Sequence, residues 1–208
     1  MGRYTGPVCR VCRREGMQLF LKGDRCFMAK CPVQTQRPPP GMHGMRRRKL
    51  SEYALQLREK QRLRKIYGMQ EGQFRNFFDK ALHRRGITGE VLLQMLECRL
   101  DTLVHRFGFG ASRSAARQFV LHGHVQVNGH KATVPSMILR AGDVISVVSK
   151  DDVRAAIRPG IDAAESRGIA PWLLLNKEEY KGEIRHIPTR DEIAPIVNEQ
   201  RVVELYSK

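Results

Sequence analysis

Residues 112–134 read SRSAARQFVLHGHVQVNGHKATV. Ser112 can cap a helix, because its hydroxyl can accept a hydrogen bond from a backbone N–H group of the first turn, and Gly123 is suited to end that helix. The alternation of apolar and polar residues over 125–127 then predicts a β-strand, and Asn-Gly at 128–129 favours a tight hairpin turn. This stretch therefore predicts a helix that leads into a β-hairpin.

The segments on either side extend this unit. The preceding segment predicts an amphipathic helix that ends at Gly108, with an apolar face formed by Leu100, Leu103, Val104 and Phe107. After the hairpin, a turn at 141–143 leads into the apolar run 144–148, which has the composition of a strand. We therefore expect an α+β fold in which two helices pack on a small, mostly antiparallel sheet.

The residues between 51 and 97 predict helices instead. Ser51 can cap a helix that ends at Gly68, and Thr88 can begin another. Between them, five apolar residues follow helical spacing: Phe74, Phe77, Phe78, Ala81 and Leu82. This part of the chain is therefore expected to form a small helical bundle domain.

The chain is strongly basic. Its formal net charge is +16 over 208 residues; residues 1–50 contain 12 basic and 2 acidic side chains, whereas residues 151–208 contain 9 basic and 11 acidic ones. A nucleic-acid partner explains so uneven a charge, because cations that neutralise phosphates release bound counterions. No membrane partner is expected, since no apolar run approaches the roughly 18–20 residues of a spanning helix.

Two groups of cations are candidates for phosphate contact. One follows the proline-rich segment 37–44, which predicts an extended linker, and the other recurs at the spacing of one helical stripe. The first group is Arg46, Arg47, Arg48 and Lys49, and the second is Arg58, Arg62 and Lys65. Either group can instead be a solvated face that contacts nothing, and this alternative stays open.

Four cysteines lie near the N-terminus with the spacing Cys9-x2-Cys12-x13-Cys26-x4-Cys31. Two close pairs of thiolates are a usual ligand set for a structural Zn2+ ion, which takes four ligands in a tetrahedron. We therefore expect a zinc-bound loop module over residues 1–45. The alternatives are an iron–sulfur cluster, two disulfides or four unrelated buried thiols. Disulfides are disfavoured because no signal peptide precedes the cysteines.

Several motifs resemble a known RNA-binding domain, the S4 domain. They are Leu96-Glu97-Cys98-Arg99-Leu100-Asp101, His122-Gly123-His124-Val125-x-Val127-Asn128-Gly129 and Arg140-x-Gly142-Asp143. This domain is shared by ribosomal proteins, tyrosyl-tRNA synthetases, pseudouridine synthases and heat-shock RNA binders. It does not by itself identify a function.

Motifs outside that domain are more specific. They are the four cysteines, Pro39-Pro40-Gly41-x-His43-Gly44, Arg58-Glu59-Lys60-Gln61-x-Leu63-Arg64-x-Ile66-Tyr67-Gly68 and Pro171-Trp172-Leu173. These motifs are similar to those of the bacterial small-subunit ribosomal protein S4 family, in its zinc-containing form. The resemblance is collinear and covers nearly the whole chain; the chain departs from the family around 154–168, where Pro159-Gly160 interrupts a helical pattern.

The resemblance implies a domain arrangement. A helical domain, 46–98, would be completed by 189–208, and an RNA-binding α/β domain would be inserted between them over 99–188. Late strands at 172–175 and 184–187 would extend the sheet of the inserted domain.

The resemblance also implies a function. The protein would be a structural constituent of the small ribosomal subunit in the cytoplasm, and would bind 16S ribosomal RNA at a multi-helix junction of the 5′ domain to nucleate assembly. Its other partners would be small-subunit protein five (S5), with which it would affect decoding accuracy, and messenger RNA near the entry channel. It would repress its own messenger RNA, and it is not expected to be a homo-oligomer.

The RNA contacts are expected to go mainly to phosphates, with the shape of the RNA being read rather than its base sequence. Besides the two cationic groups above, the predicted RNA-binding residues are Arg99, Arg113, Ser114, Arg117, His122, His124, Asn128 and Lys131. An enzyme carrying the same RNA-binding domain is one alternative, but no catalytic arrangement is visible, so no catalytic residue is predicted. A zinc-finger regulator is the other, but no helix clearly suited to the major groove is present.

Overall fold

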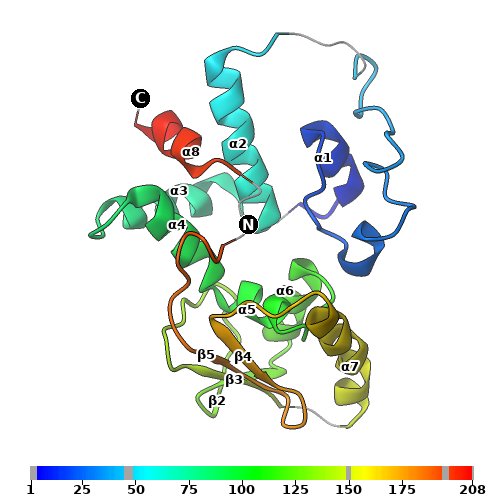
Figure 1. The fold of residues 1–208 in the computed structure, drawn as a ribbon, viewed down its shortest axis with the longest axis vertical. Helices are drawn as coiled ribbons and strands as arrows, with labels where there is room; N and C mark the ends of the chain where they lie inside the picture. The colour runs from blue at the N-terminus through cyan, green and yellow to red at the C-terminus, as the bar shows by residue number, and fades with distance from the viewer. Residues whose placement is uncertain (1–3, 45–48, 149–150, 194–196, 208) are drawn as a thin grey trace. The chain divides into compact units, whose positions relative to one another are not determined.

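The computed structural model describes residues 4–44, 49–148, 151–193 and 197–207. The chain forms two compact units, one from Met1–Leu92 together with Pro195–Lys208 and the other from Leu93–Ala194 (Figure 1). The first unit is therefore assembled from both ends of the chain.

The described part of the first unit is helical. It contains α1 (Val8–Glu15), a 3-10 turn (Gly23–Cys26), α2 (Glu52–Ile66), α3 (Glu71–Leu82), the first part of α4 (Thr88–Glu97) and α8 (Glu199–Tyr206). Ser51 caps α2 as expected, its hydroxyl accepting a hydrogen bond from Ala54 N at 3.3 Å. Asn198 caps α8 in the same way.

The last helix, α8, packs along α2, and Figure 1 shows the two side by side. Val202 is completely buried, and the ring of Tyr206 stacks on Phe78 with 4.5 Å between centroids. The Tyr206 hydroxyl donates a hydrogen bond to Glu71 Oε1 at 2.8 Å. Because an aromatic ring buries much apolar area and its hydroxyl is satisfied here, α8 completes the core of the first unit.

The second unit combines helices with an antiparallel sheet. Its helices are α5 (Leu100–Arg106), α6 (Arg113–Leu121) and α7 (Asp151–Ser166), and its strands are β1 (Val125–Val127), β2 (His130–Lys131), β3 (Val144–Val147), β4 (Leu173–Asn176) and β5 (Lys181–Ile184). The strand order is β2-β1-β3-β5-β4, and each of these neighbouring pairs is antiparallel. The expected α+β fold class is confirmed.

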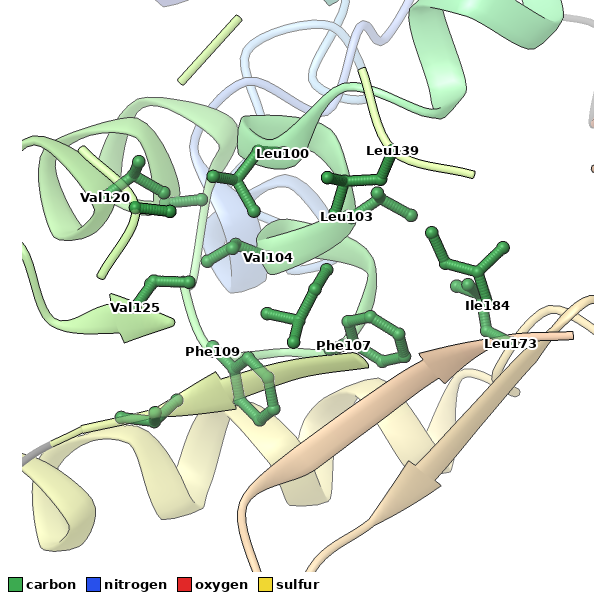
Figure 2. Packing of buried hydrophobic residues seen from close by; sticks show 14 of the residues in the cluster. Leu100, Leu103, Val104, Phe107, Phe109, Val120, Val125, Leu139, Leu173 and Ile184 are labelled. Carbon is green, nitrogen blue, oxygen red and sulfur yellow. The ribbon is translucent and has the colours of Figure 1, made fainter. Parts of the chain in front are cut away.

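The core of the second unit lies between α5, α6, α7 and the inner face of the sheet (Figure 2). Phe107, directly after α5, and Ile145 from β3 are completely buried, and Trp172 is 1% exposed. Gly182 of β5 faces Phe107, since a Cβ atom there would lie 2.5 Å from the ring. A residue without a side chain therefore lets the ring contact the sheet directly.

The hairpin that the sequence predicts is present, but some strand bounds differ. Asn128 and Gly129 have φ angles of 51° and 81°, as their tight turn requires. The returning strand is short, at 130–131, and β5 is 181–184 rather than the expected 184–187. β5 begins earlier because Asn176 Oδ1 accepts hydrogen bonds from the backbone of Glu178 and Glu179, which closes the turn quickly.

Helix α7 continues through Pro159, where the sequence predicts an interruption. Gly160 lies against Gly108, two residues beyond the end of α5: a Cβ atom on Gly160 would be 2.5 Å from the Gly108 carbonyl oxygen. Ile157 and Ile161 on the same helix belong to the core. Close packing on both sides compensates for the hydrogen bond that proline removes.

Replacing Gly160 with alanine is expected to lower the free energy of unfolding by about 1–3 kcal/mol, because the new methyl group would push α7 away from Gly108. Gly72→Ala is the matched control. It also places alanine in a helix, but nothing lies within 4 Å of the added Cβ atom, so it should stabilise by about 0.5–1 kcal/mol. Urea unfolding curves measure both; equal effects of the two changes would contradict the close packing of α7.

Candidate nucleic-acid interface

Helix α6 carries three of the predicted RNA-binding residues, Arg113, Ser114 and Arg117. Ser112 caps the helix, its hydroxyl accepting a hydrogen bond from Ala115 N at 3.2 Å. Arg113, Ser114 and Arg117 follow on the first two turns; Ser114 is exposed and the two arginines are partly exposed. The positive end of the helix dipole and two guanidinium groups therefore occur together, which favours an anion.

A buried carboxylate lies under this helix. Asp101 accepts two hydrogen bonds from Arg99, from Nε at 2.9 Å and from Nη2 at 2.7 Å. Arg117 Nη1 donates to the same Asp101 Oδ2 atom at 3.2 Å. The Arg99 side chain is 3% exposed and that of Arg117 is 29% exposed. Asp101 thus links a buried arginine to one that reaches the surface of α6.

The hairpin carries the remaining predicted residues of the second unit. His122 and Lys131 are exposed, and the ring of His124 stacks on Phe119 with 5.0 Å between centroids. Asn128 uses its side chain within the fold: its Nδ2 donates to Asp143 Oδ1 at 2.8 Å, and its Oδ1 accepts from Val144 N at 2.9 Å. The structure therefore gives Asn128 a role in holding the hairpin against β3.

His105, in the last turn of α5, has an unusual environment. Its Nδ1 lies 3.0 Å from the carbonyl oxygen of Gly110. Burial, reinforced by the positive charge of Arg113, lowers the pKa of His105 to about 4. The imidazole is therefore neutral at physiological pH, and its Nδ1–H can donate to that carbonyl.

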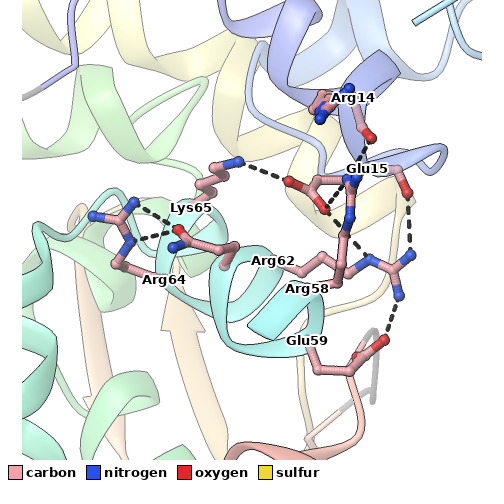
Figure 3. Close-up of polar contacts among 8 residues, drawn as sticks. Arg14, Glu15, Arg58, Glu59, Arg62, Arg64 and Lys65 are labelled. Atoms are coloured by element: carbon pink, nitrogen blue, oxygen red, sulfur yellow. Dashed lines mark hydrogen bonds and ion pairs between the residues drawn. The ribbon is translucent and has the colours of Figure 1, made fainter. Parts of the chain in front are cut away.

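The cationic stripe on α2 meets α1 (Figure 3). Arg58, Arg62 and Lys65 all lie within ion-pair distance of one carboxylate, that of Glu15, whose side chain is 2% exposed. The side chains of these three cations are 25–28% exposed. These cations are therefore not a fully solvated face. They pair with an acid inside the protein, and part of each side chain still reaches solvent.

Sequence reasoning missed the two acids that organise these cations. Glu15 lies 43 residues from Arg58 in the sequence, and Asp101 lies 16 residues from Arg117. One local signal for Glu15 does exist: it is an acid in the last turn of a helix, where the helix dipole disfavours negative charge. An acid in that position, in a segment rich in arginine, indicates cationic partners from elsewhere.

Part of the first cationic group, Arg46–Lys49, is also placed. Lys49 is exposed and lies two residues before Ser51, the cap of α2. Arg46, Arg47 and Arg48 lie outside the described residues.

The expected zinc ion is a different case. Among the residues that the structure describes, no group of three or more histidine, cysteine, aspartate or glutamate side chains is placed to hold a metal ion. The prediction of a zinc site at Cys9, Cys12, Cys26 and Cys31 is therefore wrong.

The cysteines are free thiols within the fold of the N-terminal segment, where Cys12, Cys26 and Cys31 are buried and Cys9 is partly exposed. Burial raises the pKa of Cys12 and of Cys26, which favours the neutral thiol there. The pKa of Cys31 is lowered instead, because its burial is outweighed by hydrogen bonds, led by that from the Val33 backbone. Cys26 Sγ accepts a hydrogen bond from Lys22 N at 3.3 Å. Sequence spacing alone predicted the ligand set, and spacing does not decide whether the side chains reach the geometry that a metal ion requires.

Within the described parts of the chain, no helix combines the length and the apolar character that crossing a membrane requires.

Two family models match the chain. The model for the ribosomal protein S4/S9 N-terminal domain matches residues 3–97, and the model for the S4 domain matches residues 98–145. Together they cover more than half of the chain.

Whole proteins also match from end to end. The small ribosomal subunit protein uS4 of Acidithiobacillus ferrooxidans is 52% identical over 208 residues, and that of Geobacter metallireducens is also 52% identical over 208. The uS4 protein of Thermus thermophilus is 50% identical over 209 residues. Each alignment covers 100% of this chain and 100% of the relative.

Proposed function

Because the chain belongs to the small ribosomal subunit protein uS4 family, we propose that it is a primary binder of 16S ribosomal RNA that nucleates assembly of the small subunit. Family membership makes the chain a structural constituent of that subunit, and the expected location in cytoplasmic ribosomes is confirmed. The S4 domain likewise supports RNA binding as its general activity.

The observation that carries the RNA-binding proposal is the surface of α6. Arg113 and Arg117 are one helical turn apart on a helix whose N-terminus is capped by Ser112. Arg117 donates a hydrogen bond to Asp101, which restricts its side chain. Less side-chain entropy is therefore lost when Arg117 binds a phosphate. His122, His124 and Lys131 add polar and cationic groups at the far end of α6 and on the hairpin.

The finer parts of the function rest on family resemblance and are proposed with it. We propose that the RNA site is a multi-helix junction of the 5′ domain, and that the chain acts with S5 in decoding accuracy, lies near the messenger RNA entry channel and represses its own messenger. The remaining predicted RNA contacts, Arg46–Lys49, Arg58, Arg62, Lys65, Arg99 and Asn128, belong to the same proposal. Arg99 and Asn128 support it indirectly, because each holds neighbouring groups in place.

The enzyme alternative has no comparable support. Enzymes of this kind carry a catalytic domain beside the RNA-binding domain. The relatives reported above are instead ribosomal proteins that align with this chain over their full length. The ribosomal family is in general not enzymatic.

Arg113→Ala combined with Arg117→Ala is expected to weaken binding to a 5′-domain fragment of 16S RNA. Two lost phosphate contacts should reduce the slope of log affinity against log salt by about two. Filter binding over a range of KCl concentrations measures the slope.

The matched control is Arg158→Ala with Arg185→Ala, which removes the same charge from exposed positions on α7 and just after β5. The control pair should leave the slope within about half a unit of wild type. If both pairs lower the slope equally, α6 is not the binding surface.

A further inference from the structure

Glu15 is a buried acid to which the function proposed above gives no role. Its carboxylate lies 2.7 Å from Lys65 Nζ, 3.5 Å from Arg58 Nη1 and 3.9 Å from Arg62 Nε. Figure 3 shows the three cations approaching it from one face of α2. A buried carboxylate is unfavourable unless it is paired, and here three cations of one helix pair with it.

The same arginines also bind the end of α1. Arg58 Nη1 donates to the carbonyl oxygen of Arg14 at 2.9 Å, and Arg62 Nη2 donates to that of Glu15 at 3.1 Å. These carbonyls belong to the last turn of α1, where backbone acceptors have no partner within the helix. Cations are also favoured there by the helix dipole. Side chains from α2 therefore serve as the C-terminal cap of α1.

Apolar packing contributes little to this contact from the side of α1. The buried residues of α1 are Cys12 and Glu15, and one of the two is charged. Arg58, Arg62 and Lys65 repel one another on their shared stripe. Glu59 of α2 pairs with Arg62, and Glu15 lies within ion-pair distance of all three cations. The carboxylate of Glu15 thus holds the three cations together and also holds α1 against α2.

Helix α1 brings cations of its own to this arrangement. Arg10 and Arg14 are exposed on α1, while about a quarter of each α2 cation is exposed beside it. We propose that Glu15 is a positioning residue for RNA binding, which fixes the cations of α1 and α2 as one surface for the RNA backbone. This inference rests on the RNA-binding function proposed above.

Glu15→Gln tests the inference, because it keeps the shape of the side chain and removes its charge. The change makes the chain more positive, so general electrostatics predicts tighter RNA binding. A positioning role predicts the opposite: affinity for the 16S 5′-domain fragment should fall about tenfold, and the salt slope should fall by about two. Filter binding over a range of KCl concentrations gives both values.

Glu178→Gln is the matched control, since it makes the same change of charge at an exposed turn of the other unit. Its affinity should equal that of wild type or be slightly higher. A second control is the triple variant Arg58→Gln, Arg62→Gln and Lys65→Gln. Adding Glu15→Gln to this variant should change the affinity less than twofold, because the cations that Glu15 positions are already absent.

The outcomes separate the inference from the proposed function. If wild type binds the RNA and Glu15→Gln binds equally well or more tightly, the positioning role is wrong and RNA binding stands. If Glu15→Gln weakens binding as much in the triple variant as in wild type, Glu15 acts only through the general fold of the N-terminal segment, and the inference is again wrong. If wild type does not bind the fragment, the proposed function itself fails.

Discussion

Replacing Asp101 with asparagine is expected to lower the free energy of unfolding by about 3–5 kcal/mol, because it removes the negative charge that pairs with the buried guanidinium of Arg99. Both side chains are less than a tenth exposed, and the pair has two short hydrogen bonds. Urea unfolding measures the loss. Binding of RNA should weaken as well, because Arg117 loses the same partner.

Two further variants test whether buried charge causes the loss of stability in Asp101→Asn. Glu179→Ala breaks the exposed ion pair with Lys181 and should cost less than about 1 kcal/mol. Replacing both partners, Arg99→Met with Asp101→Leu, should recover most of the stability that Asp101→Asn loses, because no unpaired charge is then buried. If the double variant is as unstable as Asp101→Asn, buried charge is not the reason for the loss.

The second large effect is a dependence of stability on pH through His105. Its pKa is about 4 in the folded chain, below the ordinary 6.5. Between pH 6.5 and pH 4 the unfolded state therefore binds a proton at His105 and the folded state does not. Above pH 6.5 neither state binds this proton, so the stability of the fold is undiminished there. Stability is lost as the pH falls from 6.5 toward 4, and the loss amounts to about 3 kcal/mol.

His105→Gln removes this titration, so the stability of the variant should fall by about 3 kcal/mol less than that of wild type between pH 7 and pH 4. His122→Gln is the control, because His122 is an exposed histidine at the end of α6. Urea unfolding at a series of pH values compares the three proteins. A wild-type and a His105→Gln curve that run parallel would contradict the buried, neutral state of His105.

Local features of the fold were predictable from the sequence. The cap at Ser51, the cap at Ser112 and the turn at Asn128-Gly129 depend on neighbours within a few residues, and all three are present. Helix α7 was harder to predict, because its continuity through Pro159 depends on contact with Gly108, far away in the sequence. Helix propensity describes an isolated segment, whereas tertiary packing decides whether that segment is helical in the fold.

The difference between local and long-range contacts also explains which residues of the candidate interface were predictable. The cations of α2 and α6 were recognisable from helical spacing, but not the acids that hold them, since Glu15 and Asp101 come from other elements. The zinc prediction failed for a related reason: short spacing within each cysteine pair does not decide whether the described side chains reach the geometry of a metal site. Charge and periodicity predict which faces exist, and only the tertiary structure tells which of them are paired.

The placement of α8 has a consequence for biosynthesis. The first unit needs Val202 and Tyr206 to complete its core, and these residues are translated after the whole of the second unit. The second unit is contiguous in the chain, so it can finish folding while synthesis is still under way. Part of the apolar surface of the N-terminal helices must then stay uncovered until α8 has left the ribosome that makes it.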